Sequence, residues 1–313
     1  MYGEEILISA SSEKSTISID DFFISHDEAL NSDTEYLWFS TKATLPVINS
    51  ARQQLSESDK VVQFCSTDVI YRFLLLAPCA VQAAVGFTGV TAIKTESVRQ
   101  AFSDAQPKSG VELLSAVAQQ IVAQQNKGWR VTEHSESSFT LKSPIPISNS
   151  SSSGQLLSVL KNLPENMLVS NSSESVTEIL AGLLLIHDFL DASHEYSQSI
   201  EGMGVDRNGD YWHGIMHRRE PDFGNAKYWF RRVGDHPCFV KLAETAHQLV
   251  ERYKDKELHE TVQMLTASGW DSIVAVDFFQ KAHSPSQQGS EWHAFAEELQ
   301  LSEMLILLTH CCS

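Results

Sequence analysis

The chain has 313 residues, of which 42% are hydrophobic and 20% charged, and its formal net charge is -17. This length allows one large domain or two ordinary ones, and the composition is that of a globular protein rather than a disordered one. The acidity argues against nonspecific binding to nucleic acid or to an anionic membrane surface, because both require widespread positive charge. The sequence contains no run of about 18 apolar residues, so it predicts no membrane-spanning helix.

The N-terminus and the cysteines indicate where the protein works. The first residues, MYGEEILISASSEKS, lack the basic and then apolar pattern of an export signal. The cysteine count is odd and no CxxC pair occurs, which is typical of reduced thiols rather than of a disulfide framework. The sequence therefore predicts a cytoplasmic protein whose free cysteines are Cys65, Cys79, Cys238, Cys311 and Cys312.

A segment rich in serine and proline divides the chain. It reads SPIPISNSSSSG over 143–154 and has no hydrophobic periodicity. We therefore expect an N-terminal region over 1–142, a linker over 143–156 and a helical domain over 157–313. The predicted fold class is mainly α, with a helical-bundle-like C-terminal domain and a smaller α+β N-terminal region.

The N-terminal region mixes strand-like and helix-like patterns. Glu5–Ser9 and Thr16–Ile19 are short β-like runs, and a hairpin is expected from Trp129–Thr132 and Phe139–Leu141. No phosphate-binding glycine loop occurs, so this region receives no predicted role. Apolar residues at helical spacing predict helices over Ala43–Leu55, Thr67–Val85 and Val111–Gln125.

The region after the linker predicts almost only helices joined by short connections, the pattern of a bundle. Capping residues and helix breakers set the expected limits, with Ser175 and Asn225 as N-caps and Pro221 and Gly234 as terminators. The expected helices are Val176–Gln198, Tyr211–Glu220, Ala226–Val233, Asp235–Lys254, Asp271–His283 and Glu291–Cys311.

The segment Tyr211–Gly234, called here the basic-aromatic segment, stands out from the acidic chain. It carries five cations, two anions and six aromatic residues. Guanidinium groups bind carboxylate or phosphate with two hydrogen bonds, so several of them in one cleft favour an anionic ligand. The predicted ligand-binding residues are Arg218, Arg219, Asn225, Lys227, Tyr228, Arg231, Arg232 and His236.

Other interpretations of these cations remain open. Arg231 and Arg232 fall in the last turn of a predicted helix, where they offset the helix dipole without any ligand. The cations can also pair with the surplus acids of the chain. In that case the segment is a buried core of ion pairs and aromatic rings.

Histidines and carboxylates form the second constellation. On the predicted helix Val176–Gln198, His187 and His194 share one stripe, and Asp188 lies on the adjoining one. His213 and His217 are four residues apart, the spacing at which one helix supplies two metal ligands, although HGIMH lacks the glutamate of HExxH. The alternative is that these histidines are hydrogen-bonded core residues. The predicted catalytic residues are His187, Asp188, His194, His213, His217 and Glu220, with His213 and His217 as candidate ligands of a divalent metal.

The motifs of this region also carry a family resemblance. The pattern HDxLDxSHxxSQ, followed by YWHxIMHRRExDxxNAKYWFRRVGxHP, resembles a family of proteins of unknown function from planctomycete-type bacteria. The resemblance covers about 179–312 and implies no activity. His187–Asp188 is also the adjacent pair of HD-type phosphohydrolases, for which His134 and Asp206 are the available but arbitrary partners.

Two functions of different classes follow from these patterns. The first is an enzyme acting on a small phosphate- or carboxylate-bearing metabolite, with arginines holding the anion and histidines serving as general base or metal ligands. In this case Arg219→Ala or Arg232→Ala should weaken ligand binding and leave the fold intact. The second is a non-enzymatic binding or scaffold protein whose basic-aromatic segment docks an acidic partner or a second copy of the chain.

Overall fold

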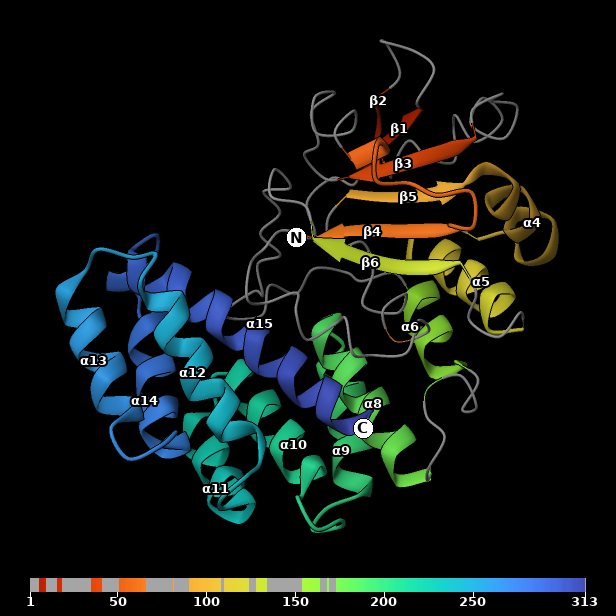
Figure 1. Cartoon of the computed structure of the whole chain (residues 1–313). Helices are drawn as coiled ribbons and strands as arrows, with labels where there is room; N and C mark the ends of the chain where they lie inside the picture. The colour runs from red at the N-terminus through yellow and green to blue at the C-terminus, as the bar shows by residue number, and fades with distance from the viewer. Residues whose placement is uncertain are drawn as a thin grey trace. The chain divides into compact units, whose positions relative to one another are not determined.

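The chain forms two compact units, Tyr2–Leu141 and Lys142–Ser313. Figure 1 shows the computed structural model, which describes residues 6–9, 16–18, 35–40, 51–65, 81, 90–107, 110–123, 128–133, 154–163, 168 and 173–312. Within these residues, one unit is built on a sheet and the other on helices. The predicted fold class, mainly α with a smaller α+β N-terminal region, is confirmed.

The N-terminal unit contains a six-stranded sheet in the order β2-β1-β3-β5-β4-β6. The strands are antiparallel to their neighbours except β4 and β6, which run parallel. Adjacent residues of β3 point to opposite faces, so Leu37 packs with α4 and α5 while Trp38 packs against Phe64 on the other face. The elements are β1 (Ile6–Ser9), β2 (Thr16–Ser18), β3 (Tyr36–Ser40), β4 (Val61–Cys65), β5 (Val90–Lys94), α4 (Thr95–Ala105), α5 (Gly110–Ala123) and β6 (Trp129–Glu133).

Most predicted elements of this unit that fall on described residues are present. β1 and β2 lie within the two predicted β-like runs, and α5 lies where a helix was expected. β6 pairs in parallel with β4, and Phe139–Leu141, its predicted hairpin partner, lies outside the described residues. Residues 43–50, nearly all of 67–85 and the linker up to 153 are also outside them. The helix α6 (Gly154–Lys161) begins inside the predicted linker range.

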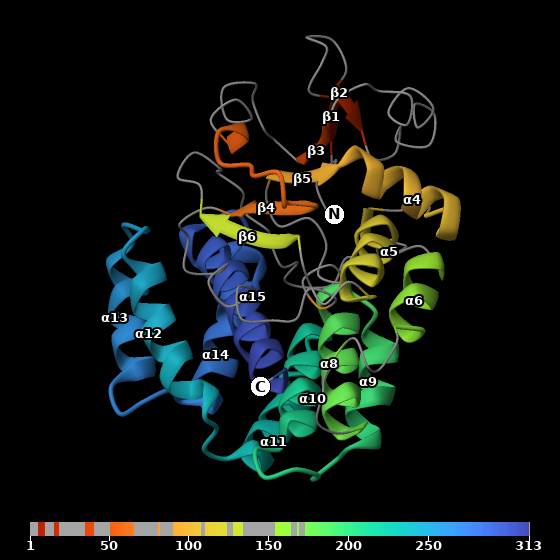
Figure 2. The same ribbon diagram turned by 45° about the vertical axis from the view of Figure 1, so that its right-hand side comes forward.

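The C-terminal unit is a bundle built around α15 (Glu291–Cys311). Every residue of α15 from Glu298 to Thr309 is buried, as expected for a helix that neighbours surround on all sides. Figures 1 and 2 show α8, α9 and α10 near the C-terminal end of α15 and α12 to α14 towards its other end. The remaining bounds are α8 (Ser173–Ile186), α9 (Leu190–Ser199), α10 (Asn208–Arg219), α11 (Phe223–Val233), α12 (Cys238–Val250), α13 (Lys256–Thr266) and α14 (Ser272–His283).

The predicted single helix Val176–Gln198 is wrong, because the chain breaks between α8 and α9. Asp188 has a φ of +69°, a left-handed backbone conformation that ends the helix. Arg219 of α10 holds this break, since its guanidinium donates to the carbonyl of Leu185 and, at 2.5 Å, to the Asp188 carboxylate. Helical periodicity across 176–198 therefore does not apply, and α9 takes a direction of its own.

Two other local predictions differ from the structure. The N-cap of α11 is Asp222, whose carboxylate accepts a hydrogen bond from the backbone N–H of Asn225 at 3.1 Å, and this releases the Asn225 side chain for other contacts. The predicted helix ending near Lys254 is followed by α13, which was not expected.

A close approach between α8 and α10 sets the position of α10. A Cβ atom on Gly182 of α8 would lie only 2.5 Å from the ring of Trp212, so glycine is required there. The indole of Trp212 is fully buried. Because α10 also carries His213 and His217, its packing against α8 fixes where these histidines lie.

Candidate metal centre

Three histidines from two helices converge in the C-terminal unit. His194 comes from α9, and His213 and His217 come from successive turns of α10. One ring nitrogen of each lies within 4.8 Å of the other two. His213 and His217 are buried, while His194 is half-buried. We call these residues the three-histidine cluster.

The local sequence explains this convergence. The four-residue spacing stacks His213 on His217, with ring centroids 4.8 Å apart and an interplanar angle of 23°. The break at Asp188 redirects α9, and the His194 ring stands edge-on to His213 at 4.5 Å. His187, the other predicted histidine of the first helix, is buried at the break and does not belong to the cluster.

His213 is the most enclosed member of the cluster. Its side chain is almost fully buried and stacks on the Trp229 indole at 3.8 Å. Burial, together with the nearby His217, His194 and Arg232, lowers the pKa of His213 to about 3, so its imidazole is neutral near pH 7. Its Nδ1 has no hydrogen-bond partner among the described residues. A buried polar atom without a partner is costly, and a bound ion or water is a common explanation.

His217 has partners at both ring nitrogens. Its Nδ1 lies 3.1 Å from a Glu220 carboxylate oxygen, and its Nε2 lies 3.0 Å from the side-chain nitrogen of Asn225. Burial lowers the pKa of His217, an effect that Glu220 partly opposes. A carboxylate behind a histidine is the arrangement that orients ligating imidazoles in metalloproteins.

The donor set suits a transition metal. Zinc binds imidazole nitrogen at about 2.0–2.1 Å, which places two ligands of a tetrahedral site roughly 3.4 Å apart. The three ring nitrogens lie within 4.8 Å of one another, so small side-chain rotations can bring all three onto one ion. Three imidazoles can therefore hold a divalent ion and leave a coordination position open.

Arg218 and Arg219 both pair with acidic side chains inside the C-terminal unit. The Arg218 guanidinium is buried, bonds to a Glu303 carboxylate at 2.5 Å and lies over the Phe279 ring at 3.8 Å. Arg219 is equally buried and bonds to Asp188. These two residues match the alternative of a buried ion-pair core, and the expectation that Arg219→Ala preserves the fold does not agree with these contacts.

The other predicted anion-binding residues are also mostly engaged. Lys227 bonds to Asp277 at 2.5 Å, and His236 is buried with its Nε2 2.9 Å from Asn208. Arg231 is exposed. Lys227, Arg231 and His236 make no described contact with the three-histidine cluster.

Arg232 and its neighbour Tyr228 lie nearer to the cluster. The Arg232 guanidinium bonds to Glu201 at 2.9 Å and to the buried Asp210 at 3.3 Å. It also lies 4.9 Å above the Trp229 ring, and its Nη1 donates to the Tyr228 hydroxyl at 3.2 Å. Through Trp229, Arg232 is the cation of the segment that borders the cluster.

The sequence did not lead us to predict that three residues of α11 form one face beside the cluster. Asn225, Trp229 and Arg232 are four and then three residues apart, so they share a helix face. Asn225 contacts His217, and Trp229 contacts His213. The spacing itself was visible in the sequence, but the wrong N-cap assignment for Asn225 hid it. For the HD-type alternative, His134 lies outside the described residues and Asp206 bonds to His310.

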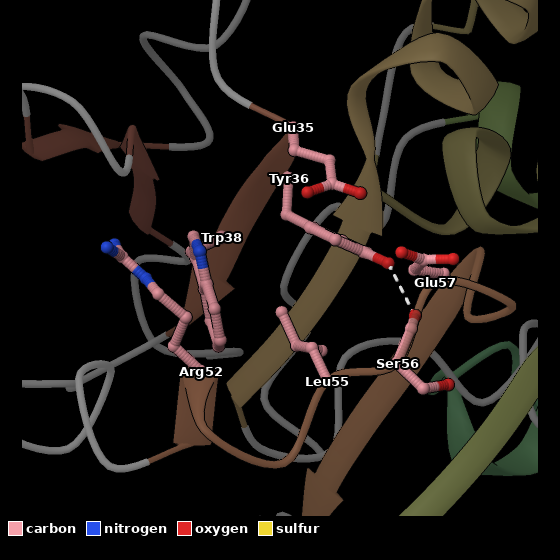
Figure 3. A pocket seen from close by; sticks show the side chains of 7 residues that line it. All are labelled: Glu35, Tyr36, Trp38, Arg52, Leu55, Ser56 and Glu57. Carbon is pink, nitrogen blue, oxygen red and sulfur yellow. Dashed lines mark hydrogen bonds between the residues drawn. The ribbon is translucent and has the colours of Figure 1, made fainter.

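The N-terminal unit has a pocket of its own, shown in Figure 3. Its volume is about 450 Å³. Figure 3 shows Arg52 and Trp38 at one side and Ser56 and Glu57 at the other. Burial raises the pKa of Tyr36 in the pocket wall to about 12, and its hydroxyl lies 2.8 Å from the Asp59 carbonyl oxygen and 3.1 Å from that of Ser56. The mixed charges of this lining favour no single class of ligand.

Comparisons with protein-family models, with curated proteins and with solved structures find no match to the chain. The resemblance to the planctomycete-type family therefore stays a prediction. Among the described residues, no helix has the length and apolar character needed to cross a membrane.

Proposed function

We propose that the C-terminal unit is a metal-dependent enzyme that acts on a small phosphate- or carboxylate-bearing substrate. The observation that carries this proposal is the convergence of His194, His213 and His217, with their ligand atoms within 4.8 Å of one another. Transition metals such as zinc, copper, iron and nickel favour imidazole, whereas magnesium and calcium favour oxygen ligands. Zinc or a similar divalent ion is therefore the expected occupant.

Three protein ligands support a catalytic rather than a structural role for the ion. Structural zinc sites usually have four protein ligands, while catalytic sites have three and keep one position for water or substrate. His194 is half-buried, so the three-histidine cluster is not fully enclosed. A zinc ion held there would lower the pKa of a bound water to about 7 and would polarise a bound carbonyl or phosphoryl oxygen.

The ion also offers a way to hold an anion that the arginines do not. Arg218 and Arg219 are committed to buried carboxylates, and Arg232 bonds to Glu201 and Asp210. A substrate oxygen can instead bind the metal directly. The alternative of a docking segment is less well supported, because most of the segment's aromatic rings are buried and most of its cations have acidic partners within the chain.

The test is a metal titration of the full chain after treatment with a chelator. Zinc and cobalt binding would be followed by calorimetry and by thermal denaturation, for the wild type, His194→Ala and His213→Ala. His247→Ala, which removes an exposed histidine of α12, is the matched control. An ion at about 100 times its dissociation constant stabilises the folded state by ~2.7 kcal/mol.

We expect one ion per chain in the wild type and in His247→Ala, and a loss of binding in both cluster variants. Turnover would then be sought with a panel of phosphorylated and carboxylated compounds, with and without the ion. Equal binding in the wild type and the cluster variants would refute the metal site. A saturated site without turnover on any compound would refute the enzymatic part.

A further inference from the structure

His194 is the member of the three-histidine cluster whose place depends on the path of the chain between helices. His213 and His217 lie four residues apart on α10, so their proximity needs only that helix. His194 belongs to α9 and reaches the other two rings only because α9 packs beside α10. The contacts that hold α9 in this position therefore decide whether the cluster offers two ligands or three.

The chain reverses its direction between α8 and α9. The Ser193 hydroxyl donates to the Ala181 carbonyl at 2.9 Å, although the two residues are 12 apart in sequence. In one continuous helix they would be separated by about 18 Å, because each residue advances the helix by about 1.5 Å. Figures 1 and 2 instead show α8 and α9 side by side. His194 directly follows Ser193, so its place in the cluster depends on this reversal.

One buried ion pair joins the reversal to α10. The Arg219 guanidinium bonds to the Asp188 carboxylate at 2.5 Å and also donates to the Leu185 carbonyl in the last turn of α8. The two charged side chains are 0% and 5% exposed, so salt screens their attraction only weakly. Arg219 follows His217 by two residues on α10, and Asp188 lies just before α9. The pair therefore connects the start of α9 to the helix that carries the other two histidines.

The backbone at Asp188 needs support from outside the turn. Its φ of +69° lies in the left-handed region, which is unfavourable for a residue with a Cβ atom, although aspartate tolerates it better than most. The planar guanidinium of Arg219 fixes the Leu185 carbonyl and the Asp188 carboxylate relative to each other. Removing the guanidinium therefore weakens the turn even where the flanking helices remain folded.

We propose that Arg219 and Asp188 are positioning residues of the metal site, which hold His194 where it can complete the ligand set of His213 and His217. This role rests on the proposed metal site. Arg219 and Asp188 do not ligate the ion but act on it through the position of α9. The pair thus turns a two-ligand face of α10 into a three-ligand site.

The experiment measures cobalt binding to the full chain by visible absorption, which reports the coordination of the ion. The neutral-pair variant, Arg219→Met with Asp188→Asn, removes the ion pair without leaving a buried charge unpaired, and asparagine tolerates the positive φ. The matched control is Arg218→Met with Glu303→Gln, which neutralises the similarly buried pair between α10 and α15. Thermal denaturation shows that each variant is folded.

We expect the neutral-pair variant to bind cobalt about 10- to 100-fold more weakly than the wild type, the usual effect of losing a residue that orients metal ligands. Its absorption at saturating cobalt should also change, because one imidazole no longer binds the ion. The control pair should match the wild type in affinity and absorption. Arg219→Lys keeps the cation but not the planar fork, so it should retain part of the affinity.

The other outcomes separate the two proposals. If the wild type binds no cobalt, the metal site fails and the positioning role fails with it. If the wild type binds cobalt and the neutral-pair variant matches it in affinity and absorption, only the positioning role is overturned. An equal loss of affinity in the control pair would also overturn it, because the loss would then follow from neutralising any buried pair on α10. If the neutral-pair variant does not fold, wild-type cobalt affinity in Arg219→Lys overturns the role.

Discussion

Arg219 gives the sharpest test of whether the arginines of the basic-aromatic segment are structural. Its side chain is fully buried, and its partner Asp188 is 5% exposed. Removing one partner of a buried ion pair leaves the other charge without compensation, which typically costs about 3–5 kcal/mol. Arg219→Met, which keeps the length of the side chain, should therefore destabilise the C-terminal unit by about that amount.

The Arg219→Met effect should be large in a thermal experiment. For a domain of between 150 and 250 residues, about 1 kcal/mol shifts the midpoint by roughly 2–4 °C, so the expected fall is roughly 6–20 °C. Scanning calorimetry of the full chain measures it. The loss should include the hydrogen bond that Arg219 makes to the Leu185 carbonyl at the break between α8 and α9.

A double variant shows whether the cost arises from the unpaired charge. Asn tolerates the positive φ that Asp188 adopts, so Asp188→Asn removes the charge without forcing the backbone to change. Arg219→Met with Asp188→Asn should recover a large part of the stability lost in Arg219→Met alone. If Arg219→Met is as stable as the wild type and loses affinity for phosphate or acetate, the structural interpretation is wrong and Arg219 is a ligand-binding residue.

Three further predictions concern the packing, the protonation and the capping of the same unit. Gly182→Ala forces a Cβ into the Trp212 ring, so the free energy of unfolding in urea should fall by about 1–3 kcal/mol; an unchanged midpoint would contradict the close approach. Burial, and to a smaller extent the nearby His310, lowers the pKa of His236 to about 4. As the pH falls from about 6.5 towards 4, His236 therefore gains a proton in the unfolded state but not in the folded state, and the folded state loses stability. Between about pH 7 and pH 5 this loss is about 2 kcal/mol, and His236→Gln should lose correspondingly less when the two pH values are compared by urea denaturation. Asp222→Ala removes the N-cap of α11 and should cost about 0.5–2 kcal/mol, whereas no change would mean that the cap is dispensable.

The helical architecture was largely predictable because apolar periodicity and breakers are local signals. Asp271, Ser290 and Gly234 lie at the ends of α14, α15 and α11, close to the predicted limits. The break at Asp188 was not predictable from the same signals. It depends on Arg219, which lies far along the chain and stabilises a backbone conformation that the periodicity of 176–198 does not indicate.

The candidate site was predictable only in part, for a similar reason. The spacing of His213 and His217 indicates a two-ligand face on one helix, and the structure stacks those rings. The third member, His194, was expected beside His187 on a continuous helix, and its position next to His213 depends on the redirected α9. The role of the cations was the least predictable part, because charge pairing with Glu303 or Glu201 is a property of the tertiary fold.

The pairing of the cations has a consequence for the kinetics of association. Arg218, Arg219, Lys227 and Arg232 all have acidic partners, so the basic-aromatic segment presents little uncompensated positive charge to the solvent. With a net charge of -17, the protein as a whole attracts cations and repels anions at long range. Salt screens both effects. Uptake of a divalent ion should thus slow as the ionic strength rises, while the approach of an anionic substrate should become faster.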